Sequence, residues 1–84
     1  MAGENCFMNL VVTLEQLRKA RRFVIDGEQC MLRQRKVVDQ MERQGFDTLN
    51  AILFLEYLEE MQAQYLALRD RLERQLLVLV RPEE

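Results

Sequence analysis

Apolar residues recur every three or four positions along two long segments of this chain, and a short polar stretch separates the segments. Each segment carries two lines of residues that repeat every seven positions and are offset from each other by three. In the first segment these lines are Leu17, Val24, Met31 and Val38, and Ala20, Gly27, Gln34 and Met41. In the second segment they are Ala51, Leu58, Tyr65, Leu72 and Leu79, and Phe54, Met61, Leu68 and Gln75. Such heptads are typical of helices that pack along a shared seam, and we predict an all-α fold.

The residues between the two segments predict a sharp turn. Gly45 can adopt the left-handed backbone that commonly ends a helix, and Phe46 is then placed to fold back on Met41. Asp47 can accept hydrogen bonds from the free N–H groups at the start of the next helix. The chain is therefore predicted to form an antiparallel, coiled-coil-like hairpin of two helices.

Capping residues predict where the hairpin begins and ends. Thr13 and Gln16 have the spacing of a capping box, which starts a helix, and Pro82 keeps the second helix from continuing past Arg81. The residues before Thr13 form an apolar arm that can cover the end of the second helix. The predicted order is arm 1–12, first helix 13–44, turn 45–47, second helix 48–80 and tail 82–84, with the hairpin spanning 13–81.

The turn also predicts which residues face each other. Folding the chain at Phe46 places Val24 opposite Leu68 and Gly27 opposite Tyr65. Large residues then face small ones, as interdigitating layers require. In this interpretation Gly27 makes room for a larger side chain, and the alternative is a ligand slot beside it.

Apolar residues make up 49% of the chain, which is more than a two-helix seam can bury. We therefore predict that the hairpin dimerises into a four-helix bundle and acts as a homo-oligomeric interaction or scaffold module. Its partner would be a second copy of itself, or another protein. The alternative is a monomer whose long Arg, Gln and Met side chains cover the excess. The predicted contact residues are Phe23, Cys30, Val37, Ile52, Leu53, Leu76 and Val78.

Basic residues on the outer side of the first helix suggest a second function, a regulatory module that contacts nucleic acid. The candidate contacts are Arg18, Lys19, Arg22, Arg33 and Lys36. Asp26 and Asp39 interrupt this group, and the net charge of −2 with a pI near 5.2 is unlike that of a nucleic-acid reader. A solvated charged face is therefore the favoured interpretation.

The composition offers little for catalysis or metal binding. The chain has no His and no Ser, and Cys6 and Cys30 are too far apart along it to suggest a disulfide or a metal site. We therefore predict a protein that is not an enzyme and needs no cofactor or metal. The longest apolar run, Leu76 to Val80, is too short to span a membrane, and no signal peptide is recognisable, so we predict a cytoplasmic location.

A resemblance adds to these predictions. The chain carries Gly27-Glu28, the Gly45-Phe46-Asp47-Thr48 turn and Arg69-Asp70-Arg71-Leu72. In these motifs it resembles a group of short, functionally uncharacterised bacterial proteins. The resemblance implies a bacterial helical hairpin and implies no activity.

Overall fold

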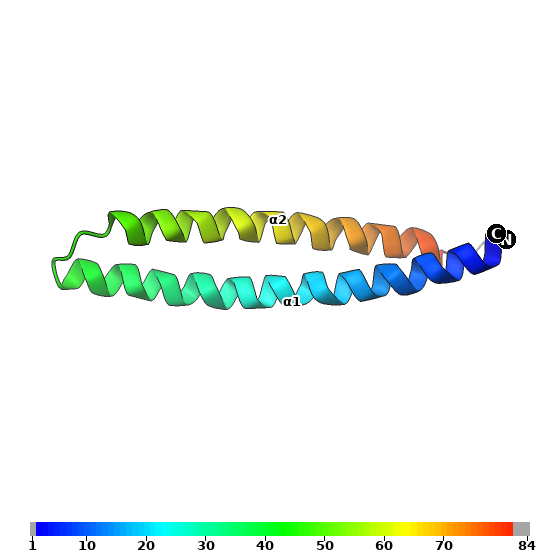
Figure 1. The fold of residues 1–84 in the computed structure, drawn as a ribbon, viewed down its shortest axis with the longest axis horizontal. Helices are drawn as coiled ribbons and strands as arrows, with labels where there is room; N and C mark the ends of the chain where they lie inside the picture. The colour runs from blue at the N-terminus through cyan, green and yellow to red at the C-terminus, as the bar shows by residue number, and fades with distance from the viewer. Residues whose placement is uncertain (1, 82–84) are drawn as a thin grey trace.

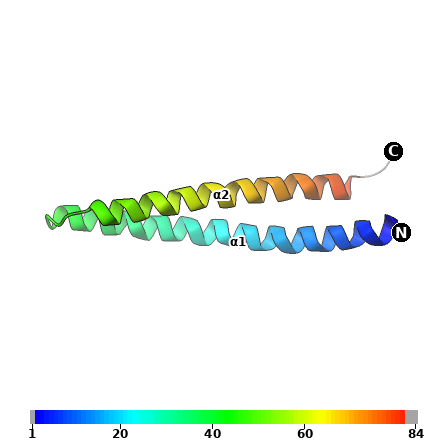
Figure 2. The same ribbon diagram turned by 45° about the horizontal axis from the view of Figure 1, so that its top comes forward.

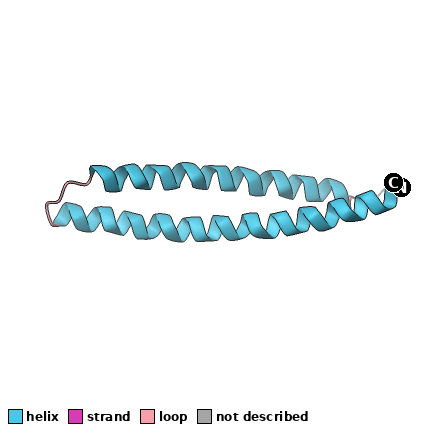
Figure 3. Cartoon of the chain, in the orientation of Figure 1, coloured by secondary structure: helices cyan, strands magenta, loops and turns pink. Residues whose placement is uncertain are grey.

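The computed structural model describes the backbone of residues 2–81, which form two long helices joined by one loop. Helix α1 spans Ala2–Arg43 and helix α2 spans Leu49–Val80. The helices pack antiparallel into a rod of 64 × 18 × 15 Å (Figure 1). Residues 2–81 contain no strand (Figure 3). The predicted helical hairpin is therefore confirmed.

The turn forms as its residues predict. Gly45 has a φ of 75°, and its N–H donates to Glu42 O at 3.1 Å while the Phe46 N–H donates to Met41 O at 2.9 Å. This pair of bonds is the Schellman arrangement, which satisfies the last carbonyls of α1. Asp47 Oδ1 accepts a hydrogen bond from the Leu49 N–H at 3.0 Å. The Phe46 side chain is 61% exposed, so backbone bonds rather than apolar burial hold the turn.

The predicted start of the first helix is wrong. Helix α1 begins at Ala2, so residues 2–12 are helical and do not form a separate arm. Thr13 is 1% exposed, and its hydroxyl accepts a hydrogen bond from Gln75 Nε2 on α2 at 2.9 Å, so it is a packing residue and not a cap. Leu10 continues the heptad line of Leu17 and Thr13 continues that of Ala20, so packing against α2 extends the helix toward its N-terminus. Beyond this point α1 extends past the last turn of α2 (Figures 1 and 2).

The apolar core is best developed toward the open end of the hairpin. Leu17, Ala20 and Leu72 form a buried cluster, against which Leu68 and Leu76 pack. On α1, all eight residues of the two predicted heptad lines are buried or half-buried. The seam of α1 is therefore confirmed.

On α2, one of the two predicted heptad lines faces the partner helix along its whole length, and the other does so only in part. The line from Ala51 to Leu79 is buried or half-buried. The second predicted line is wrong at its two ends, where Phe54 and Gln75 are exposed, whereas Met61 is half-buried and Leu68 packs against the buried cluster. The observed line lies one residue further along and consists of Leu55, Gln62, Arg69 and Leu76.

This rotation of α2 also changes the pairing beside Gly27. A Cβ atom at Gly27 would collide with Gln62 Oε1, so Gln62 fills the space that the sequence predicted for Tyr65. Tyr65 instead stacks on Phe23, with ring centroids 5.2 Å apart. The predicted pairing of Gly27 with Tyr65 is therefore wrong, although Gly27 does make room for a larger side chain.

Candidate interaction surface

Three glutamine side chains cross from one helix to the other. Their amide nitrogens each donate a hydrogen bond across the seam, two of them to backbone carbonyls. The bonds are Gln34 Nε2 to Ala51 O at 3.0 Å, Gln62 Nε2 to Val24 O at 2.9 Å and Gln75 Nε2 to Thr13 Oγ1 at 2.9 Å. Polar seam residues favour one alignment over others, because a slipped helix leaves their donors unpaired.

Gln62 is the most deeply buried of these glutamines, at 5% exposure, and the sequence did not predict its role. Its Oε1 is buried and has no hydrogen-bond partner among the described residues. The oxygen lies against Gly27, where any side chain would displace it. The spacing of seven from Leu55 to Gln62 to Arg69 to Leu76 was the available signal.

An open groove of about 230 Å³ lies beside this contact, between the two helices. Phe23, Cys30, Tyr57, Met61 and Tyr65 are among the residues that line it. The aromatic rings in this region are close together, since Phe54 and Tyr57 have centroids 6.4 Å apart in addition to the Phe23–Tyr65 stack. The groove is therefore largely apolar and aromatic.

The groove belongs to a longer surface that we call the apolar face. Leu68 joins it, because it lines an adjoining depression together with Phe23. Val37 joins it by spacing, because it follows Cys30 by seven residues and so projects from the same side of α1. The apolar face consists of Phe23, Cys30 and Val37 on α1 and Phe54, Tyr57, Met61 and Leu68 on α2.

The apolar face is accessible, and its seven residues carry no charge. The side chains of Phe23, Val37, Phe54 and Tyr57 are between 43% and 57% exposed. The α1 line of this face continues in both directions with neutral polar residues, Gln16 on one side and Gln44 on the other. This line of α1 thus carries no formal charge, and the charges of Asp26, Lys19 and Arg71 lie at the rim of the face.

The remaining predicted contact residues lie elsewhere. Leu76 packs against the buried core cluster and Ile52 is half-buried. Leu53 is exposed outside the groove. Val78 lines a separate depression at the end of α2 together with Leu77 and Val80. The structure therefore brings Phe23, Cys30 and Val37 to one face and does not bring the other four to it.

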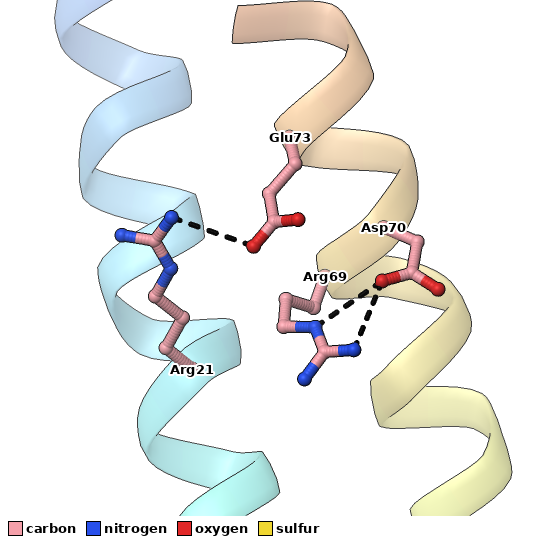
Figure 4. A network of polar contacts seen from close by, with 4 residues as sticks. All are labelled: Arg21, Arg69, Asp70 and Glu73. Atoms are coloured by element: carbon pink, nitrogen blue, oxygen red, sulfur yellow. Dashed lines mark hydrogen bonds and ion pairs between the residues drawn. The ribbon is translucent and has the colours of Figure 1, made fainter.

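The opposite flank of the hairpin is charged. Arg21 Nη2 of α1 contacts Glu73 Oε1 of α2 at 3.4 Å, and Arg69 contacts Asp70 at 3.0 Å (Figure 4). The heptad line that begins at Arg21 continues with Glu28, Arg35 and Glu42. We call this flank the charged face. Its alternating charges suit exposure to water.

The basic residues predicted as nucleic-acid contacts lie in two groups on α1. Arg18, Lys19 and Arg22 lie around one depression together with Arg21. Arg33 and Lys36 follow about 16 Å or more along the helix axis, at 1.5 Å per residue. The five residues therefore do not form one compact patch.

Several of these basic side chains have acidic partners. Arg18 Nη2 lies 2.7 Å from Glu15 Oε1, and Arg22 Nε lies 3.5 Å from Asp26 Oδ2. The hydrogen bond from Arg18, and secondarily its charge, lowers the pKa of Glu15 below its ordinary value. The same bond raises the pKa of Arg18. These pairs reduce the positive potential that a phosphate would meet.

Two further observations bear on other kinds of site. Within residues 7–81, whose side chains the structure describes, no group of three or more His, Cys, Asp or Glu side chains is placed to hold a metal ion. Neither helix, in its described part, contains an apolar stretch long enough to cross a membrane.

Comparisons with protein-family models, with curated proteins and with solved structures gave no match for this chain. The resemblance to short bacterial proteins therefore stays a prediction. Function has to be inferred from the surface of the hairpin itself.

Proposed function

We propose that this protein is a homo-oligomeric interaction or scaffold module in which two hairpins associate through their apolar faces into a four-helix bundle. The observation that carries the proposal is the exposed apolar face, with Phe23, Val37, Phe54 and Tyr57 all about half exposed. Contiguous exposed apolar surface of this kind marks protein interaction sites in soluble proteins. In a four-helix bundle these residues would form the central core.

The exposed area of the hairpin supports the same proposal. The chain exposes 6878 Å², whereas a compact monomer of 10.1 kDa is expected to expose about 5300 Å². The excess is roughly 1600 Å² per chain, and burying it in a dimer would give an interface in the range of obligate homodimers. A second copy supplies an apolar surface of matching length, because an isologous pair uses the same face twice.

The oligomeric state tests the proposal directly. Sedimentation equilibrium over a concentration series in the micromolar range should give twice the chain mass of 10.1 kDa, or a higher multiple. The dimer should also bury Cys30, so that its thiol reacts more slowly with a soluble thiol reagent as protein concentration rises. A single species at the chain mass throughout the series would contradict the proposal.

A second candidate function is a regulatory module that contacts nucleic acid through α1. It is favoured by one observation, the position of Arg18, Lys19, Arg21 and Arg22 around a single depression. The net charge of −2 weighs against it. Fluorescence titration with mixed-sequence DNA and RNA at low salt tests this function, because phosphate contacts weaken steeply as salt rises. No binding at low salt would exclude it.

A further inference from the structure

We infer that the two hairpins pair with their loops at opposite ends, around a two-fold axis that passes beside Cys30. Helix α1 then packs antiparallel against α1 of the partner subunit, and α2 against α2. This inference rests on the proposed dimer and adds its orientation and register. Three features of the apolar face support it: the pattern on α1, the pattern on α2 and the charges at the rim.

The apolar residues of α1 are arranged symmetrically about Cys30. Phe23 lies seven residues before it and Val37 seven residues after it. A two-fold axis at Cys30 therefore places Phe23 against Val37 of the partner subunit, which pairs a large side chain with a small one. Gln16 and Gln44, fourteen residues away on each side, then meet as two neutral amides at the ends of the contact.

The same two-fold axis also pairs residues of α2 with α2 of the partner subunit. Cys30 lines the same groove as Leu58, so an axis beside Cys30 crosses α2 near Leu58. Phe54 lies four residues before Leu58 and Met61 lies three residues after it. The axis therefore places Phe54 against Met61 of the partner subunit, and favourable contacts between sulfur and an aromatic ring are common.

Charges at the rim of the apolar face match this arrangement. Asp26 lies four residues before Cys30, and Arg33 lies three residues after it. Asp26 lines the groove, and the Arg33 Nη2 atom lies 3.4 Å from Cys30 Sγ, so both residues border the proposed contact. The two-fold axis brings Asp26 next to Arg33 of the partner subunit, and symmetry repeats the pair. Two opposite-charge contacts therefore stabilise this orientation.

The arrangement with both loops at the same end would instead bring like charges together at the rim. In that arrangement α1 would lie against α2 of the partner subunit. Lys19 and Arg71 line one depression and so lie at the same level of the rod. Lys19 would therefore meet Arg71 of the partner subunit, twice by symmetry, and like charges at a rim oppose association.

Charge exchange tests the orientation. Asp26→Arg and Arg33→Asp should each weaken the dimer by roughly tenfold or more, because each places like charges together twice. The double variant Asp26→Arg/Arg33→Asp restores opposite charges and should recover affinity to within about threefold of the original. The matched control exchanges Glu28→Arg and Arg35→Glu on the charged face, which should leave the dimer unchanged. Dissociation constants come from sedimentation equilibrium, and circular dichroism verifies that each variant stays helical.

Cross-linking at Cys30 supplies an independent readout. In a Cys6→Ser chain, a short bismaleimide should join two copies by adding one Cys30 thiol to each end. In a Cys6→Ser/Cys30→Ala chain, a thiol introduced by Val37→Cys should not cross-link, because the two copies of position 37 lie about 21 Å apart along the axis.

The outcomes separate the two proposals. A monomer in sedimentation would overturn the proposed dimer and this inference together. A dimer in which the double exchange fails to recover affinity, or in which Cys30 fails to cross-link, would overturn the orientation alone.

Discussion

The apolar face and the charged face lie on the same two helices, flank the same seam and share the same heptad spacing, yet they suit different surroundings. The charged face carries Arg21, Glu28, Arg35 and Glu42 on α1, whereas the equivalent line of the apolar face carries Gln16, Phe23, Cys30, Val37 and Gln44. A two-helix hairpin has a single seam, so each flank meets water or another subunit. We therefore expect flanking positions, rather than the seam, to decide whether two hairpins associate.

The two faces also differ in the free energy that contacts on them can contribute. Burying a large apolar side chain contributes about 1.5–3 kcal/mol, and the apolar face offers several such side chains. Exposed ion pairs, such as that of Arg21 and Glu73 at 3.4 Å, contribute about 0–1 kcal/mol each. Association should therefore depend mainly on the apolar face, and the following changes test that difference.

The largest effect is expected from a charge placed in the apolar face. Phe23→Glu should weaken the dimer by roughly a hundredfold or more, because association would bury an unpaired carboxylate. Ile25→Glu is the matched control, since Ile25 is 51% exposed where Phe23 is 47%, and two residues turn the side chain about 200° around the helix. Sedimentation equilibrium measures both variants. Equal weakening by the two would contradict the assignment of the face.

A smaller effect is expected at the floor of the groove. Gly27→Ala should displace Gln62 Oε1 and break the bond to Val24 O, at a cost of about 1–3 kcal/mol that alanine's higher helix propensity offsets by about 1. In a Gln62→Ala background the same change should stabilise the hairpin by about 1 kcal/mol. Urea unfolding, monitored by circular dichroism, measures the free energy of unfolding of the four chains in this double-mutant cycle. An identical effect of Gly27→Ala in both backgrounds would show that the two residues are not coupled.

A weaker response is expected on the charged face. Glu73→Ala removes the contact with Arg21 and should lower stability by no more than about 1 kcal/mol, because both side chains are about half exposed. It should leave the dimer dissociation constant unchanged. Unfolding curves at low and high salt measure the stability, and the small difference should shrink as salt screens the pair. A large loss of dimer affinity would show that the interface includes the charged face, which would contradict the proposal.

The smallest effect concerns pH. The pKa of Glu15 is lowered in the folded chain by its hydrogen bond with Arg18, so the pair stabilises the fold above the unfolded pKa of Glu15. This contribution is lost as the pH falls through the lowered folded pKa. NMR titration of the Glu15 side-chain carboxyl should show the lowered value, and Arg18→Ala should return it toward the ordinary one. An unchanged titration in Arg18→Ala would assign the shift to another cause.

Much of the fold could be predicted because its signals are local. The turn depends on residues that are neighbours in the chain, and Gly45 and Asp47 act as their chemistry predicts. Thr13 shows the limit of local signals. A threonine followed by glutamine at capping-box spacing predicts a helix start, but its hydroxyl bonds to Gln75 on the other helix. Burial against α2 outweighed the local preference.

The candidate surface could be predicted only in part. The line of Phe23, Cys30 and Val37 is visible in the sequence as a heptad that flanks the seam of α1. Phe54, Met61 and Leu68 have the same spacing on α2, and from the sequence alone they are equally suited to the seam and to the flank. They were predicted in the seam, whereas the structure places Phe54 and Met61 beside the groove on the apolar face.

By itself, the sequence determined two helices, the left-handed glycine between them and the face of α1 that meets α2, because each of these depends on spacing within one segment. The tertiary structure alone decided which of two adjacent heptad lines of α2 faces inward. The line that starts at Phe54 has three apolar residues of four and the line that starts at Leu55 has two, so hydrophobicity alone favours the first line. The choice depends on contact between segments: Gln62 reaches Val24 O only where Gly27 leaves room for its amide.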